Sequence, residues 1–113
     1  MKGYKYLEVS TLRELGRLDL VSTDSQVLDW VLVELPKVFP TCFVKDDYVG
    51  EFPSGEKCSC RIDWPKKEKW TAGSGCLWAV KQLCLQGWEP FQVEETRWHG
   101  STYHLRFEVT DNG

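Results

Sequence analysis

Apolar and polar residues alternate in several short segments of the chain, and this two-residue period is typical of strands that bury one face. Residues 4–9 predict a first strand, because they are rich in aromatic and β-branched side chains. Residues 41–44, 48–52 and 57–64 predict three further short strands. In the last of these, every second side chain is apolar, which predicts a buried face made of Cys58, Cys60, Ile62 and Trp64.

Two segments in the N-terminal third carry helix-start signals. A Thr-x-x-Glu capping box at Thr11 is followed by leucines at helical spacing, so residues 12–18 predict a short helix. A Thr-x-x-Gln box at Thr23 precedes residues 24–35, where the box favours a helix and the density of apolar residues leaves a buried strand open. We expect Pro36 to end this segment, because the residue before a proline avoids helical backbone.

The strongest helical pattern covers residues 76–86. Apolar side chains recur there at helical spacing and predict a core-facing stripe of Cys76, Leu77, Val80, Leu83 and Cys84. We expect Gly87 to end the helix in left-handed backbone, with Trp88 folding back on the last turn.

The C-terminal part predicts a β-hairpin with a three-residue loop that ends at Gly100. This loop length pairs Phe91 with Phe107 and Val93 with Leu105, which places their apolar side chains on one face.

Together these segments predict a single α+β domain over residues 1–113. The expected architecture is a mostly antiparallel sheet with one main helix, at about residues 76–86, packed on one face, and with one or two short N-terminal helices.

Charge and composition narrow the classes of function. The chain has 113 residues and a formal net charge of −3, which argues against nucleic-acid binding driven by overall charge. No apolar run approaches the roughly 20 residues of a membrane span, and the start of the chain lacks a signal-peptide pattern. Five cysteines cannot all pair within one chain, and because no secretion signal is evident we expect reduced thiols and a cytoplasmic protein.

The chain is rich in tryptophan, with six residues of this type. We expect half or more of them in the core and two or three at a recognition surface, because an indole offers a large rigid face with one polar handle.

The main candidate ligand site lies just before the main helix. Lysines, flanking tryptophans and a Gly-Ser-Gly segment meet there at an expected helix start, where backbone N–H groups can bind an anion and an indole can stack on a planar group. The alternative is a solvated basic loop with an ordinary serine cap. The candidate ligand-binding residues are Lys66, Lys67, Lys69, Trp70, Gly73, Ser74 and Gly75.

A second candidate site is the hairpin tip, Arg97, Trp98 and His99. A tryptophan at a loop tip faces solvent, where it can stack on a ligand or contact a protein. The alternative is that Trp98 folds onto its own sheet or onto a neighbouring subunit, which would be compatible with a homo-oligomer.

Metal binding and catalysis have little support in the sequence. Cys58 and Cys60 lie two apart in an expected strand and both point into its apolar face, whereas zinc sites need about four ligands. His99 and His104 lie in the distant hairpin, and neither has a partner that would make a catalytic pair. We therefore expect no metal, no cofactor and no enzymatic activity.

The helix-to-strand segment around Leu83, Gly87, Trp88 and Glu89 resembles the L-x-x-x-G-W-E signature of a small bacterial and phage family of unknown function. The likeness covers residues 4–9 and 76–109 and implies an opening strand, a helix and a glycine-containing closing hairpin. At the level of protein class, the chain is also similar to phage proteins that sequester nucleotide immune signals of their host.

Two functions therefore follow as expectations. The first is a non-enzymatic binding protein that sequesters a small anionic, nucleotide-like ligand in a counter-defence role. The second is an interaction module or inhibitor that binds a host protein complex through exposed aromatic side chains and sheet edges.

Overall fold

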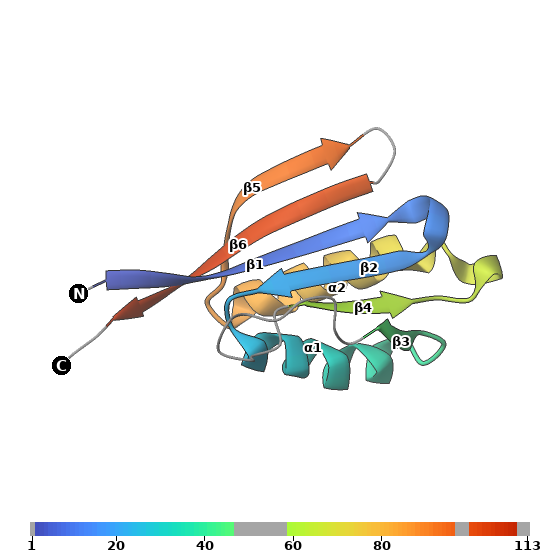
Figure 1. Ribbon diagram of the computed structural model, residues 1–113, viewed down its shortest axis with the longest axis horizontal. Coiled ribbons are helices and arrows are strands. Elements are labelled where there is room, and N and C mark those ends of the chain that lie inside the picture. Colours follow the sequence, from blue (N-terminus) through green and yellow to red (C-terminus); the bar gives the residue numbers. More distant parts are fainter. Residues whose placement is uncertain (1, 47–58, 97–99, 111–113) are drawn as a thin grey trace.

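The computed structural model describes residues 2–46, 59–96 and 100–110 (Figure 1). Within these residues the chain forms an α+β fold whose strands all belong to one sheet. The strands are β1 (Lys2–Leu12), β2 (Arg17–Ser22), β3 (Phe43–Asp46), β4 (Ser59–Asp63), β5 (Glu89–Thr96) and β6 (Gly100–Thr110). The helices are α1 (Ser25–Val38) and α2 (Thr71–Leu85), with short 3-10 turns η1 (Arg13–Leu15) and η2 (Lys66–Glu68).

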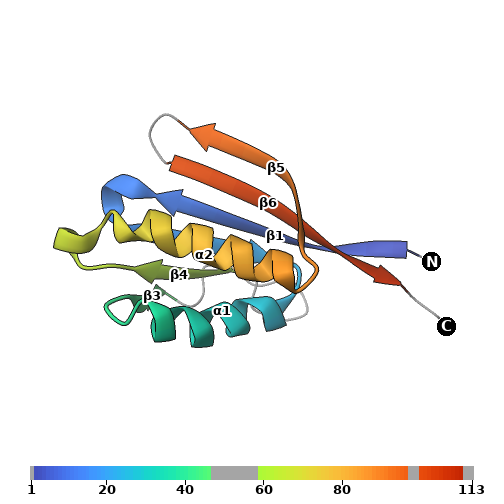
Figure 2. The same cartoon turned by 180° about the vertical axis from the view of Figure 1, so that it is seen from behind.

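The strands are ordered β3-β4-β2-β1-β6-β5, and each neighbouring pair is antiparallel. The two helices lie together on one face of this sheet, as the front and back views show (Figures 1 and 2). We call the opposite face, which neither helix covers, the open face. At one end β1 and β6 run past their neighbours as a two-stranded ribbon that carries both termini.

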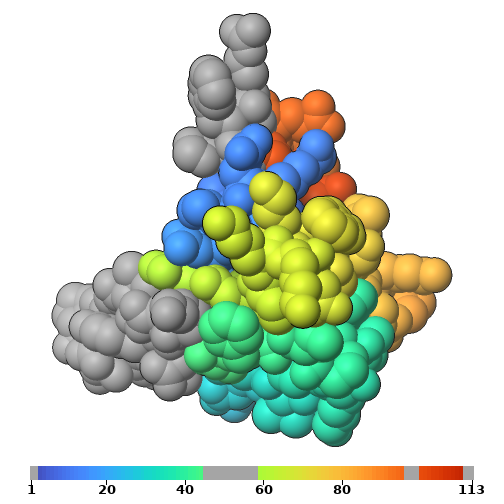
Figure 3. All heavy atoms as spheres, turned by 90° about the vertical axis from the view of Figure 1, so that its right-hand side faces the viewer, coloured from blue at the N-terminus to red at the C-terminus, as the bar shows by residue number. Residues whose placement is uncertain are grey.

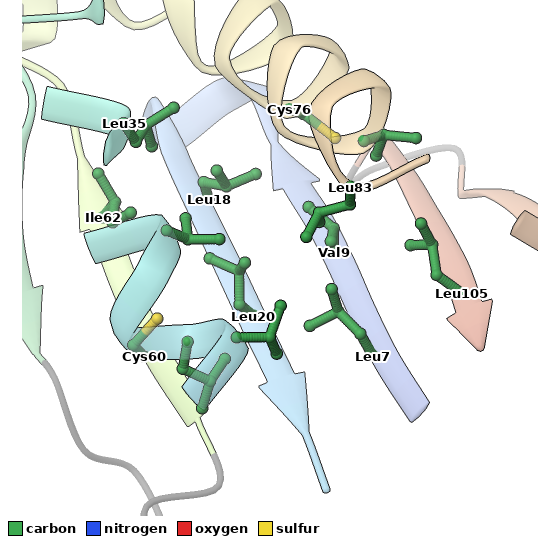
Figure 4. Packing of buried hydrophobic residues seen from close by; sticks show 14 of the residues in the cluster. Leu7, Val9, Leu18, Leu20, Leu35, Cys60, Ile62, Cys76, Leu83 and Leu105 are labelled. Atoms are coloured by element: carbon green, nitrogen blue, oxygen red, sulfur yellow. The ribbon is translucent and has the colours of Figure 1, made fainter. Parts of the chain in front are cut away.

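The core lies between the helices and the sheet (Figure 4). Alternate strand residues point into it because side chains of a strand alternate between the two faces. The fully buried strand side chains are Leu7, Val9, Leu18, Leu20, Cys60, Ile62 and Leu105. The helices add Val27, Leu28, Val31, Leu35, Ala72, Cys76, Ala79, Val80 and Leu83.

The expected helix over residues 12–18 is wrong. That stretch forms η1 and then enters β2, with Gly16 in left-handed backbone between them. Leu18 and Leu20 alternate with polar residues, and this two-residue period outweighs the helical spacing of the leucines that precede them.

The segment that the sequence left open between helix and strand is helix α1. Its cap is Asp24, whose carboxylate accepts a hydrogen bond from the backbone N–H of Gln26 at 3.0 Å, whereas Thr23 accepts one from the N–H of Tyr6. The helix does not stop before Pro36 but continues to Val38. A proline in the last turn removes one hydrogen bond, and its fixed φ is compatible with helical backbone.

The main helix begins five residues earlier than expected, at Thr71. Cys76, Val80 and Leu83 face the core as predicted, but Leu77 and Cys84 are exposed and two alanines complete the buried stripe. Gly87 has a φ of +107° and ends the helix as predicted, with the Trp88 N–H donating to the Leu83 carbonyl at 3.0 Å.

The closing hairpin forms, but its register differs from the prediction. Thr96 pairs with Gly100, and Val93 lies opposite Tyr103 rather than Leu105. A bulge between Pro90 and Gln92 interrupts the ladder, because proline has no N–H to donate there. This bulge turns Phe91 onto the open face, away from its expected partner.

The remaining predictions concern short strands. The buried face of Cys60, Ile62 and Trp64 is confirmed. The strand expected at 41–44 appears two residues later as β3. Cys58 and the strand expected at 48–52 lie outside the described residues. No helix in the described part of the chain is long and apolar enough to cross a membrane.

Candidate functional site

A hollow of about 320 Å³ opens where the first turns of α2 meet the ends of β1 and β6. A second hollow of about 290 Å³ adjoins it, because Arg13, Trp70 and Gly73 line both. Figure 3 views this end of the molecule, where the yellow-green start of α2 lies beside the blue turn between β1 and β2. The other lining residues are Thr11, Ser74, Cys76, Leu77, Ser101 and Tyr103 in the first hollow, and Glu14 and Lys69 in the second.

Two glycines allow these segments to meet. Gly16 has a φ of +63°, and a Cβ at this position would lie 2.7 Å from the Cα of Lys69. Gly100 has a φ of +95°, and a Cβ there would lie 2.5 Å from the carbonyl oxygen of Thr11. Both positions therefore require glycine for their backbone angle and for space. The turn that carries Arg13 is consequently held against both the start of α2 and the start of β6.

Trp70 is the most accessible aromatic side chain among the described residues, with 70% of its surface exposed. The other described tryptophans pack in or against the core: Trp64 and Trp88 are buried, and Trp30 and Trp78 are partly buried. The Trp70 indole borders both hollows, so a planar ligand could stack on it from solvent.

Among the described residues that line the two hollows, two are cationic and one is anionic. Arg13, Lys69 and Glu14 line the second hollow, and Arg13 also lines the first. A guanidinium can bind a phosphate or carboxylate with two parallel hydrogen bonds, and an ammonium adds a point charge. The rim of the site is therefore suited to an anion.

Cys76 and Thr11 contribute buried groups to the first hollow. Burial raises the pKa of the Cys76 thiol, and a hydrogen bond with the Thr11 side chain partly offsets that rise. The thiol is therefore neutral at physiological pH, so it is a poor nucleophile. Thr11 and Cys76 therefore contribute no charge to the lining of the first hollow.

The helix start expected at the Gly-Ser-Gly segment is wrong, because α2 begins at Thr71. The N–H groups of Ala72 and Gly73 donate to the carbonyls of Lys69 and Trp70, at 3.3 and 3.2 Å. The amide of Gly73 is therefore already engaged within the first turn of α2, and Ser74 follows it in the same helix. They line the hollow, but as part of the helix surface.

The other predicted site residues divide into three groups. Lys69 lines the second hollow, whereas Lys66 and Lys67 are exposed on η2 and do not border either hollow. Gly75 is buried against the Trp64 ring and lines neither hollow. The candidate residues at the hairpin tip, Arg97, Trp98 and His99, lie outside the described residues.

Sequence reasoning missed Arg13, Ser101 and Tyr103. Arg13 was assigned to an expected helix, and the other two to a strand remote from the lysines. They reach the site through the antiparallel pairing of β1 with β6, which joins residues about 90 positions apart in the chain. Gly16 was the one available signal, because a glycine that interrupts a helical pattern can mark a close approach of two backbones.

Within residues 2–46, 59–96 and 100–110, no cluster of three His, Cys, Asp or Glu side chains could hold a metal ion. Comparison of the chain with protein-family models, with curated proteins and with solved structures found no match.

Proposed function

We propose that the protein is a non-catalytic binding protein that sequesters a small anionic ligand with a planar group, of the nucleotide class. The observation that carries the proposal is the position of Trp70, whose largely exposed ring stands between two hollows that Arg13 also borders. An exposed indole gains little from burial in its own fold, so its contribution is available to a ligand.

The arrangement suits a ligand that has two different parts. Its planar group would stack on Trp70, and such stacking contributes about 1–3 kcal/mol per base in other proteins. Its anionic group would lie near Arg13 and Lys69, where the attraction is Coulombic and therefore weakened by salt. Each hollow is near the lower end of the range of ligand pockets, which is about 300–1,000 Å³, so the ligand would be small.

A sequestering role follows from the same features. The described residues that line the hollows offer aromatic rings and cations for binding, whereas the Cys76 thiol among them is neutral and buried. Removing a nucleotide signal from solution requires binding alone. We therefore propose that the protein acts in the cytoplasm in counter-defence, by sequestering such a signal.

Thermal unfolding with a panel of nucleotides and inorganic phosphate tests the proposal. A ligand at a hundred times its Kd stabilises the native state by about 2.7 kcal/mol, which raises the melting temperature by several degrees. We expect this shift for at least one nucleotide with the parent protein and a much smaller shift with Trp70→Ala.

Leu85→Ala is the matched control, because Leu85 is 76% exposed at the opposite end of α2. It should retain the full shift. A flat panel with the parent protein, or a shift that Trp70→Ala retains, would contradict the proposed site.

A further inference from the structure

The open face carries an aromatic patch that has no part in the hollows described above. Tyr4 and Tyr6 of β1 and Phe91 of β5 are between 42% and 46% exposed there. The rings contact one another, since the ring centroids of Tyr6 lie 6.2 Å from Tyr4 and 6.3 Å from Phe91. We call these three residues the aromatic patch.

The backbone is irregular where it brings Phe91 into the patch. The bulge between Pro90 and Gln92 changes which face the next side chain meets, and bulges commonly redirect a side chain. Without it, Phe91 would point to the core side with Val93. The fold instead leaves Phe91 partly exposed beside Tyr6 and His104, where it buries less of its surface than a core position would.

The patch already holds one guanidinium group from its own chain. The guanidinium of Arg106 lies over the Tyr4 ring at 4.9 Å and over the Phe91 ring at 5.4 Å. Glu89 accepts its hydrogen bonds, at 3.3 and 3.5 Å, and raises the pKa of Arg106. The aromatic rings and a carboxylate of this surface therefore bind a guanidinium group together.

Carboxylates beside the patch offer further sites for a cation. The imidazole of His104 lies between Glu8 and Glu94, at 3.4 and 3.5 Å from one carboxylate oxygen of each. Both of these carboxylates are about half exposed, whereas Glu89 already accepts hydrogen bonds from Arg106.

The other half of the open face differs in this respect. Arg17 lies 3.5 Å from Asp63, and Arg61 lies 3.9 Å from Asp19, so each described cation there has an anion of its own. We call this part of the face the balanced half.

We propose that the aromatic patch and its carboxylates form a docking surface for an arginine-rich, extended segment of a partner protein. Arginines of the partner would stack on the exposed rings of Tyr6 and Phe91 and pair with Glu8 and Glu94, in the manner that Arg106 shows within the chain. Alternate side chains of an extended segment point the same way, so arginine at every second position would face the sheet. Exposed aromatic rings also suit nucleic-acid bases, but the carboxylates would repel the phosphates.

Fluorescence anisotropy with a labelled peptide of alternating arginine and alanine tests this proposal. We expect saturable binding, weaker binding of the same peptide with lysine, and none with glutamate. Phe91→Ala and Tyr6→Ala should each weaken binding by about two- to fivefold, the range of exposed cation–π contacts. Glu8→Gln, which preserves size, should weaken binding at low salt by up to about fivefold and lose this effect at high salt.

Phe43→Ala is the control variant. Phe43 pairs with Asp63 and is 46% exposed, against 44% for Phe91, so it is a matched phenylalanine on the balanced half of the same face. It should leave binding unchanged, and circular dichroism should show all variants folded. Absence of saturable peptide binding, equal weakening by Phe43→Ala, or tighter binding of a single-stranded RNA oligonucleotide than of the arginine peptide would overturn the proposal.

Discussion

Two glycines of helix α2, two residues apart, should respond to the same substitution in opposite directions. Gly73 has no atom within 4 Å of the place where a Cβ would be built. A Cβ built at Gly75 would lie 2.7 Å from Cη2 and 2.9 Å from Cζ2 of the buried Trp64 ring. We expect Gly73→Ala to stabilise the protein and Gly75→Ala to destabilise it.

The magnitudes follow from helix propensity and from packing. Alanine in place of glycine within a helix contributes about 0.5–1 kcal/mol, and Gly73 should gain this without a steric cost. Gly75→Ala gains the same amount but forces apart a packed ring, which typically costs about 1–3 kcal/mol. The free energies of unfolding of the two variants should therefore differ by about 1–3 kcal/mol.

Urea unfolding of the two variants and the parent measures this difference. Trp64→Phe in the Gly75→Ala background should recover part of the loss, because phenylalanine lacks the outer ring that makes the contact. This double variant also removes the Trp64 indole N–H, which has no hydrogen-bond partner among the described residues. Equal stability of Gly73→Ala and Gly75→Ala would refute the packing of Trp64 against α2.

Two further predictions concern titratable groups. In a Cys58→Ser variant, Cys84 should react quickly with a thiol reagent because it is exposed, whereas buried thiols such as Cys76 should react only on unfolding. Rapid labelling of Cys76 in the native protein would contradict its place in the core. Burial raises the pKa of Asp19 above its ordinary value, although two arginines oppose this rise. The native state therefore holds the carboxyl proton more tightly than the unfolded state does, so the free energy of unfolding should fall as the pH rises from the ordinary pKa through the raised one. Asp19→Asn should remove this fall in urea titrations across acidic pH, and an unchanged pH dependence would refute it.

Local patterns predicted much of the fold. The alternation of Cys60, Ile62 and Trp64 identified a buried strand face, and Gly87 marked the end of the main helix. Both signals depend on residues that are neighbours in the sequence, so they can be interpreted without knowing what packs against them. The spacing of leucines over residues 12–18 misled for the same reason, because pairing with distant strands decided that segment.

The candidate site was predictable only in part. Lys69, Trp70, Gly73 and Ser74 border the hollows, and all four stand in one sequence segment. Arg13 joins them through strand pairing and through close backbone approaches, which no local pattern contains. The expected helix start was wrong because the helix begins earlier than its apolar stripe, at Thr71.

Calorimetric titration of a binding nucleotide at low and high salt tests the central claim most directly. Lys69→Ala and Arg13→Ala should weaken binding mainly at low salt, since a charge is screened over about 10 Å at 0.1 M salt. Trp70→Ala should remove about 1–3 kcal/mol at either salt concentration. Lys66→Ala, an exposed lysine that borders neither hollow, should have no comparable effect. Nucleotide binding that is the same in the Trp70→Ala variant and the parent would contradict the account.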